Sequence, residues 1–115
     1  MTGDCIFCSI AGEEMDADIV YQDERILAFE DANPQAPVHI LVIPRKHIES
    51  LHQVSEGDFE LIGKIHRVIQ KLAAERDIAD SGYRVVNNCG EQGGQTVDHL
   101  HFHLLGGRAF SWPPG

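Results

Sequence analysis

The segment His99-Leu100-His101-Phe102-His103 is the feature that most constrains the fold of this chain. In a β-strand alternate side chains point to opposite faces, so the three histidines would share one face and the apolar residues the other. A helix would scatter the same imidazoles around its circumference. The pattern therefore predicts a strand over residues 97–105, with an apolar face toward a core and a row of imidazoles on the other face. Imidazole is the side chain that acts as nucleophile, proton carrier or metal ligand near neutral pH.

Further apolar segments predict the rest of a sheet and one helix. Short β-branched and apolar runs predict strands over residues 19–21, 26–30, 38–43 and 83–87. Ser55 and Asp58 suit the start of a helix over residues 55–77, in which apolar residues recur three and four positions apart. The expected apolar stripe is Phe59, Ile62, Ile65, Ile69, Leu72 and Ala73. We expect an α+β fold, an antiparallel sheet of about five strands with one long helix packed on it, forming a single domain over residues 1–115.

Composition excludes several classes of protein. The net charge of −9 disfavours binding to nucleic acid, because the chain would repel a phosphate backbone. The sequence has no apolar run of about 18 residues, the length that a membrane-spanning helix needs. Residues 1–5 show no basic region followed by an apolar stretch, so we expect no secretory signal and a cytoplasmic location. With three cysteines, an odd number, thiols or metal ligands are favoured over a disulfide framework.

A glycine-rich connection precedes the histidine strand. Gly93 and Gly94 let the backbone approach a ligand closely, and Gln95 and Thr96 add an amide and a hydroxyl. Asn88 lies at the start of the same loop. Backbone N–H groups, amides and imidazoles together suit a phosphoryl group with charge on its non-bridging oxygens, although a hairpin with a flexible tip is the plainer interpretation.

Several motifs in order resemble the histidine triad family. The segment 93–108, GGQTVDHLHFHLLGGR, carries its His-x-His-x-His-x-x signature and is similar to the Hint branch in particular. The segments 34–37 (PQAP), 39–47 (HILVIPRKH) and 112–115 (WPPG) are similar to the same branch, so the resemblance extends from about Cys5 to the end of the chain. It implies the HIT-like fold, including a short helical N-terminal segment.

The resemblance implies a nucleotide hydrolase that acts at the α-phosphate. Hint-like members cleave adenosine and guanosine phosphoramidates to a nucleoside monophosphate and an amine. The middle histidine, here His101, would be the nucleophile and form a nucleotidyl-histidine intermediate. One ring nitrogen of His101 must stay free, so the other should donate to a carbonyl or to a neighbouring side chain, for which His39 is a candidate. His103 would contact the phosphate, and Thr96 stands where Hint proteins usually carry the serine whose hydroxyl helps the amine leave.

Nucleotide-binding residues are also implied by the resemblance. Asp31 would accept hydrogen bonds from both ribose hydroxyls, a sensible arrangement for a carboxylate. Asn88, Gly94 and Gln95, with Thr96, His101 and His103, map onto the phosphate contacts. Candidates for the base pocket are Phe7, Phe29, Ala32 and Ile40, each of which could equally be a core residue.

Cys5 and Cys8 form a second candidate motif. A C-x-x-C pair commonly supplies half of a tetrahedral zinc site, which histidines elsewhere complete. Some histidine triad relatives bind zinc in this way, and carried over to this chain the ligands would be Cys5, Cys8, His47 and His99. The zinc would be structural, with no catalytic metal expected. Two reduced cysteines without a metal, or a redox disulfide, are the alternatives.

Other interpretations of the triad remain open. A dinucleoside polyphosphate hydrolase of the Fhit type shares the intermediate and differs only in its leaving group. A purine-nucleotide-binding protein with little turnover would use the same pocket. Three histidines on one strand could also hold a catalytic metal, but the glycine-rich loop would then be unexplained.

The resemblance also implies a homodimer. In Hint proteins the C-terminus of one subunit reaches the active site of the other. Phe110 and Trp112 suit such an interface, because aromatic residues make good interface anchors. Trp112 is accordingly a candidate nucleotide-site residue.

Overall fold

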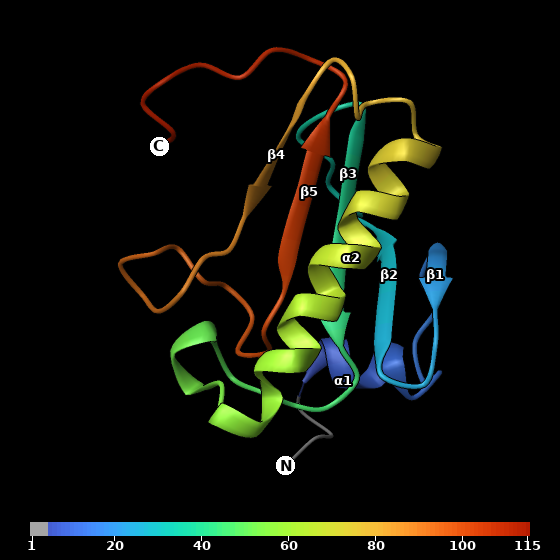
Figure 1. Cartoon of the computed structure of the whole chain (residues 1–115). Coiled ribbons are helices and arrows are strands. Elements are labelled where there is room, and N and C mark those ends of the chain that lie inside the picture. Colours follow the sequence, from blue (N-terminus) through green and yellow to red (C-terminus); the bar gives the residue numbers. More distant parts are fainter. Residues whose placement is uncertain (1–4) are drawn as a thin grey trace.

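A computed structural model describes residues 5–115, and these form one antiparallel sheet with two α-helices (Figure 1). The sheet has the order β1-β2-β3-β5-β4. Its strands are β1 (Ile19–Gln22), β2 (Ile26–Glu30), β3 (Val38–Pro44), β4 (Tyr83–Val86) and β5 (Phe102–Gly106). The prediction of an α+β fold with about five strands and one long helix is therefore confirmed. Residues 1–4, part of the segment judged above for a secretory signal, lie outside the described residues.

The two faces of the sheet carry two separate apolar clusters. On β3, Val38, Ile40 and Val42 belong to the larger cluster, and Leu41 and Ile43 to the smaller one. The alternation on β2, β3 and β5 assigns the two clusters to opposite faces, because successive side chains of a strand point to opposite sides. All seven residues of β3 are buried, which explains why its sequence is almost continuously apolar.

The long helix α2 (Phe59–Glu75) covers the face of the larger cluster (Figure 1). It starts later than predicted, because residues 56–58 form a single 3-10 turn, η3 (Glu56–Asp58), before it. The predicted stripe is partly wrong. Phe59 is 57% exposed, and Leu61 and Val68 are buried in its place. The first helical residue thus lies outside the buried stripe, which runs from Leu61 at helical spacing.

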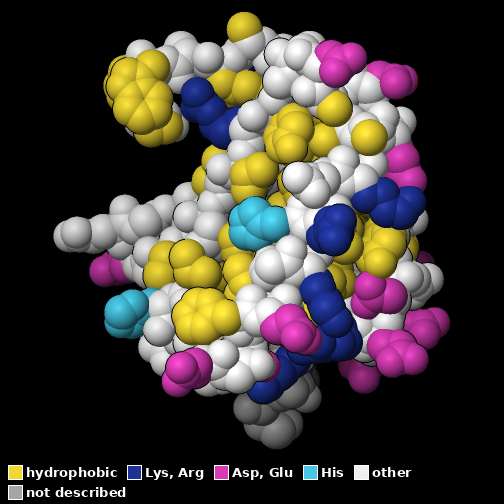
Figure 2. Space-filling view, in the orientation of Figure 1, with side chains coloured by type: hydrophobic (Ala, Val, Ile, Leu, Met, Phe, Trp, Pro, Cys, Tyr) yellow, Lys and Arg dark blue, Asp and Glu magenta, His cyan; other side chains and the backbone are white. Residues whose placement is uncertain are grey.

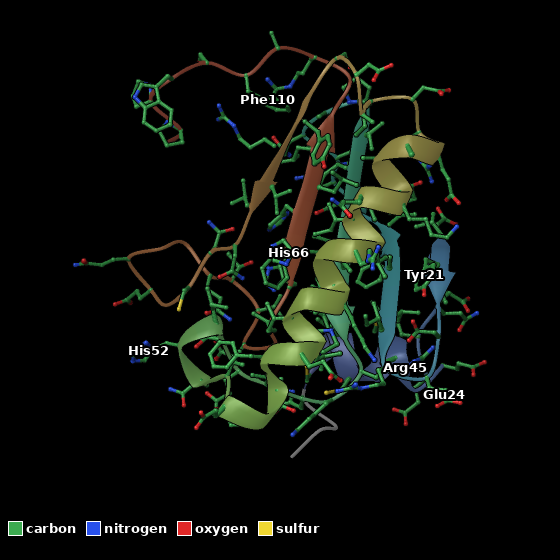
Figure 3. All side chains as sticks on the ribbon, in the orientation of Figure 1. Tyr21, Glu24, Arg45, His52, His66 and Phe110 are labelled. Carbon is green, nitrogen blue, oxygen red and sulfur yellow. The ribbon has the colours of Figure 1, made fainter. Side chains whose placement is uncertain are left out.

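The short helix α1 (Ile6–Ala11) covers part of the opposite face, which confirms the helical N-terminal segment. Phe7 and Ile10 pack there against Leu27, Phe29 and other residues of the smaller cluster. Arg45, labelled in Figure 3, fastens this helix to the β1–β2 turn, donating to the carbonyl oxygens of Ala11 at 2.9 Å and Asp23 at 2.7 Å. Because α1 has only six residues, it leaves the rest of this sheet face uncovered.

The histidine segment is a regular strand only from Phe102 onward, so the predicted strand over 97–105 is too long at its start. The ladder with β3 begins at the Val42–Phe102 pair. Pro44 ends β3 and has no N–H to donate, so the chain before Phe102 finds other partners. The Leu100 N–H donates to the Ile48 carbonyl at 2.7 Å. The alternation nevertheless persists, since Leu100, Phe102 and Leu104 all lie in the larger cluster.

The C-terminal residues leave the sheet as an extended arm. In the space-filling view this arm, with apolar side chains near its end, stands away from the body of the molecule (Figure 2). Phe110, near its start, stacks with the guanidinium groups of Arg84 and Arg108, 5.2 and 4.2 Å from the ring centroid (Figure 3). Trp112 is 82% exposed. Among the described residues, no helix is both long and apolar enough to cross a membrane.

Gly106 generates a test of the packing between β5 and the segment that follows α2. A Cβ added to Gly106 would lie 2.5 Å from Ile78 Cδ1 and 3.2 Å from Ile78 Cβ. We expect Gly106→Ala to lower the free energy of unfolding by roughly 1–3 kcal/mol, measured by urea denaturation, because overpacking forces neighbours to shift.

Gly57→Ala is the matched control, since a Cβ there meets nothing within 4 Å. In an Ile78→Ala background, adding Gly106→Ala should cost much less than in the wild type. An equal cost in both backgrounds would contradict the packing described here.

Candidate active site

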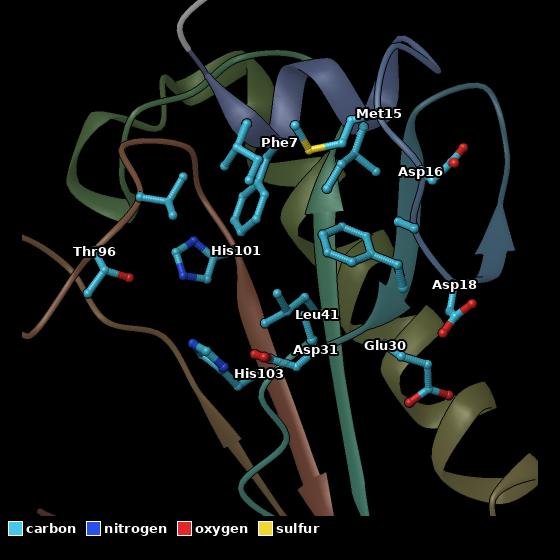
Figure 4. Close-up of a pocket in the computed structure, with 16 residues that line it drawn as sticks. Phe7, Met15, Asp16, Asp18, Glu30, Asp31, Leu41, Thr96, His101 and His103 are labelled. Atoms are coloured by element: carbon cyan, nitrogen blue, oxygen red, sulfur yellow. The ribbon is translucent and has the colours of Figure 1, made fainter.

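A pocket of about 600 Å³ opens on the sheet face that α1 covers only in part (Figure 4). Phe29 and Leu41 from β2 and β3 line it, together with Phe7 from α1. His101 and His103 line its other side. Residues 15–18, which follow α1, and Thr96 and Val97, which precede the histidine segment, complete its lining.

Most predicted nucleotide-site residues line this one pocket. They are Phe7, Asp31, Ala32, Thr96, His101 and His103, together with the base-pocket candidate Phe29. Ile40 is the exception among the base-pocket candidates. It is fully buried in the larger cluster, because its position on β3 turns it toward α2. Of the two alternatives left open for Ile40, the core is therefore the one found, whereas Leu41, the next residue, lines the pocket.

The hydrogen bond of His101 determines which of its ring nitrogens is free. His101 Nδ1 lies 2.7 Å from the carbonyl oxygen of His99. A carbonyl oxygen only accepts, so Nδ1 carries the proton and donates it. In the neutral imidazole, Nε2 then has a free lone pair. Of the two kinds of partner expected for His101, a carbonyl is the one found. The candidate His39 is not its partner, because the backbone two residues earlier already supplies the acceptor.

His39 instead pairs with His103. The Gln35 N–H donates to His39 Nδ1 at 3.0 Å, so the proton of a neutral His39 is on Nε2. His39 Nε2 lies 2.9 Å from His103 Nδ1 and donates to it. While this hydrogen bond is made, the proton of a neutral His103 is on Nε2, the atom available to donate to a ligand. The sheet explains the contact, because His39 pairs with Leu105 and so lies diagonally opposite His103.

Burial keeps the imidazoles of His39 and His103 neutral. Desolvation lowers the pKa of His103 to about 4, and the neighbouring His101 and His39 rings act in the same direction. Desolvation also lowers the pKa of His39, against the opposing effect of the Asp31 carboxylate. The donor and acceptor assignments given above for His39 and His103 require neutral rings, so the pKa shifts and the hydrogen bonds of these two residues agree.

The glycine-rich loop is held by its own hydrogen bonds. The Gln95 amide accepts from the Gly90 N–H and donates to the carbonyls of Glu49 and Val97. Asn88 Nδ2 donates to the Gly93 carbonyl at 2.7 Å, and the Gly94 N–H donates to Glu91. Asn88, Gly94 and Gln95 therefore use these donors within the loop and do not line the pocket, whereas Thr96 does. Trp112, on the C-terminal arm, does not line the pocket of its own chain either.

The four predicted metal ligands converge beside this pocket. The ligand atoms of Cys5, Cys8, His47 and His99 all lie within 4.8 Å of one another. His99 Nδ1 is 3.3 Å from Cys5 Sγ and 3.4 Å from Cys8 Sγ, and His47 Nδ1 is 3.1 Å from Cys8 Sγ. Cys5 precedes α1 directly, and its sulfur accepts from the Cys8 N–H, which draws the two thiols together.

The donor set fits a tetrahedral metal such as zinc. His99 Nε2 donates to the Pro44 carbonyl at 2.8 Å, which leaves the lone pair on Nδ1, the atom facing the thiols. Typical zinc bond lengths and tetrahedral angles place sulfur and nitrogen ligands about 3.5 Å apart, close to the separations found here. Burial and the neighbouring Cys5 thiol raise the pKa of Cys8 to about 11, so the thiolate form needs a cation beside it. The cluster could therefore bind a metal ion.

Two other metal arrangements fit less well. The triad histidines do not converge on one point, since His99 groups with the cysteines and His103 with His39 and Asp31. The set of Asp31, His39 and His103 is compact, but the Gln35 N–H occupies His39 Nδ1 and leaves the proton on the nitrogen that would have to ligate.

Sequence reasoning missed two groups that hold the site. Asn87 Nδ2 donates to the His101 carbonyl at 2.9 Å, and its Oδ1 is buried without a partner within the described residues. The Gln35 main-chain N–H fixes the tautomer of His39. Neither carries a motif signal, since one is an asparagine beyond a strand end and the other is a backbone group.

The chain belongs to the HIT family, whose domain model matches residues 12–110. An uncharacterised HIT-like protein from Synechococcus elongatus is 50% identical over 115 residues, which are 100% of each chain. A HIT family hydrolase from Legionella pneumophila has a similar structure, with a TM-score of 0.96 at 48% identity over 97% of this chain and 100% of that one. A histidine triad nucleotide-binding protein from Candida albicans aligns with a TM-score of 0.81 at 31% identity, over 96% of this chain and 83% of that one.

Proposed function

We propose that this protein, acting as a single domain, is a Hint-like enzyme that hydrolyses purine nucleoside 5′-phosphoramidates at the α-phosphate, giving AMP or GMP and an amine. The observation that carries the proposal is the hydrogen bond of His101 Nδ1 to the His99 carbonyl, which leaves Nε2 as the unbonded ring nitrogen of a buried side chain in the wall of a nucleotide-sized pocket. Similarity to two known proteins supports the proposal. One is described as a HIT family hydrolase and the other as a nucleotide-binding protein.

The first step is a displacement at phosphorus. His101 Nε2 attacks the α-phosphorus, and the bond between phosphorus and the leaving nitrogen breaks. The His101 ring gains positive charge, which its Nδ1–H bond to the His99 carbonyl stabilises. The leaving nitrogen takes a proton from solvent water and departs as an amine. The Thr96 hydroxyl, which lines the pocket and makes no hydrogen bond within residues 5–115, donates a hydrogen bond to that nitrogen as it leaves.

The second step returns the enzyme to its starting state. Water attacks the phosphorus of the nucleotidyl-histidine, and the bond to Nε2 breaks. The water gives up a proton to solvent as the nucleoside monophosphate forms, and this proton replaces the one that the amine took in the first step. In both steps charge develops on the non-bridging oxygens, and the Nε2–H of His103 is the proposed donor to them. The hydrogen bond from His39 to His103 at 2.9 Å supports this role, because it keeps the His103 proton on Nε2.

The nucleoside is proposed to occupy the apolar part of the pocket. Asp31 would accept hydrogen bonds from the ribose hydroxyls, and Phe7 and Ala32 would contact the purine. For Asn88, Gly94 and Gln95 we propose an indirect part, in which their hydrogen bonds set the shape of the loop that presents Thr96.

A homodimer is the proposed assembly. Two features support it. Trp112 is exposed on an extended arm, and Tyr83 and Val85 are exposed on β4, which is an edge strand of the sheet. In such a dimer the arm of one subunit would bring Trp112 to the nucleotide site of the other.

Zinc is the metal proposed for the Cys5, Cys8, His47 and His99 cluster. Bound there, it would supply structural cross-linking, because four protein ligands leave no position for a catalytic water. The free thiols persist in a reducing compartment, which is consistent with a cytoplasmic protein.

Turnover of two substrates side by side tests the proposed function. Adenosine 5′-phosphoramidate should be hydrolysed faster than diadenosine tetraphosphate. His101→Asn should lower kcat by more than about 10³-fold, because the covalent route is lost. His66→Asn, which removes an exposed imidazole on α2, is the matched control and should retain activity (Figure 3).

The other outcomes are informative. A clear preference for the dinucleotide would move the protein to the dinucleoside polyphosphate hydrolases. Bound AMP without turnover of either substrate would favour a nucleotide-binding protein, and would contradict the proposal.

Metal content and stability together test the zinc site. Protein purified without chelator should hold about one zinc ion per chain, and Cys8→Ser should abolish it. Loss of the metal should lower the free energy of unfolding by roughly 3–4 kcal/mol, since binding stabilises only the folded chain. Cys89→Ser, in the glycine-rich loop, is the matched control and should change neither value. A native protein that is zinc-free and equally stable would overturn the assignment.

A further inference from the structure

One proton in the candidate active site has two acceptors. His39 is only 4% exposed, and the Gln35 N–H already occupies its Nδ1, so its single N–H is on Nε2. That N–H lies 2.9 Å from His103 Nδ1 and 3.3 Å from Asp31 Oδ2. The N–H is hydrogen-bonded to His103, and the Asp31 carboxylate lies close enough to attract the same N–H by its charge, so the two compete for it.

The Asp31 carboxylate is fixed on one side and open on the other. Its Oδ1 accepts from the Asn33 N–H at 2.8 Å, and the Asp31 N–H donates to the His39 carbonyl at 2.9 Å, which tie it to His39 through the backbone. Its side chain is 20% exposed and lines the pocket beside His103 (Figure 4). A ligand hydroxyl can therefore reach the same carboxylate that competes for the His39 proton.

We propose that Asp31 is a positioning residue. When the ribose hydroxyls bind to its carboxylate, the shared Nε2–H of His39 turns toward His103. The inference rests on the proposed function, in which Asp31 accepts the ribose hydroxyls. Two hydroxyl donors on the carboxylate weaken its hold on the His39 proton, which then points fully at His103 Nδ1. His103 is thereby held with its own proton on Nε2, the donor proposed for the phosphate.

This role differs from simple anchoring of the sugar. An anchor binds ground state and transition state equally, so loss of the hydroxyls would raise KM and leave kcat unchanged. A residue that sets the donor at the phosphate acts on charge that develops in the transition state, so loss of the hydroxyls lowers kcat. The shared proton of His39 thus predicts that the sugar affects the chemical step.

Nitrogen NMR of the wild-type protein tests the inference without turnover. The protein, labelled with ¹⁵N in its histidines, is saturated in turn with AMP and with 2′,3′-dideoxy-AMP, and His103→Gln assigns the signals of that ring. With AMP, His103 should show the pure Nε2–H tautomer. With the dideoxy ligand, and without ligand, its two nitrogens should move toward an average of both tautomers.

The two failures are distinguishable. Equal His103 signals with both bound nucleotides would overturn the inference and leave the proposed function standing. Failure of AMP to bind at all would overturn the proposed function, and the inference with it.

A kinetic comparison supplies the second readout. The phosphoramidate that lacks both ribose hydroxyls should have a kcat lower by roughly tenfold in the wild type, the usual scale for disturbing a group that orients another. In His39→Gln the two substrates should share one kcat, because the connection to His103 is broken, while the dideoxy substrate keeps its higher KM. A change in KM alone in the wild type would contradict the inference.

Discussion

Burial of both faces at the centre of the sheet is the constraint on which the rest of the structure depends. Alternate residues of β3 and β5 must satisfy different surroundings, so Ile40 and Leu104 pack under α2 while Leu41 and His103 face the pocket. A shift of one residue in the register between these strands would place imidazoles in the larger core and leucines in the pocket. The same alternation that stabilises the fold therefore brings the candidate catalytic groups to one side.

Fixed backbone groups give the imidazoles their direction. Three backbone groups decide which ring nitrogen carries the proton. The His99 carbonyl does so for His101, and the Pro44 carbonyl does so for His99. The Gln35 N–H does so for His39. His99 contributes twice, because its carbonyl orients His101 and its own ring faces the thiols of the metal cluster. The candidate nucleophile and the candidate metal site are thus two outcomes of one short segment, and each needs the lone pair of a neutral imidazole.

The sequence predicted those parts of the site that repeat or match a motif. The alternating histidines, the C-x-x-C pair and the hydrophobic strands of period two were all interpretable, and the four metal ligands do converge. The late start of regular β5 and the exposed Phe59 were not predicted, and the burial of Ile40 under α2 was only one of two alternatives. Each depends on how elements meet in space. A carbonyl was one of the two partners expected for His101, but the sequence could not say which carbonyl, since a backbone group has no motif of its own.

The central claim is that His101 forms a covalent bond to the nucleotide, so the reaction is two displacements at one phosphorus. The stereochemistry at that atom tests the claim most directly. Hydrolysis in ¹⁸O-water of a nucleoside phosphoramidate with a chiral α-phosphorus should proceed with overall retention, because each displacement inverts the centre once. Overall inversion would mean that water attacks the substrate directly, and would contradict the role given to His101.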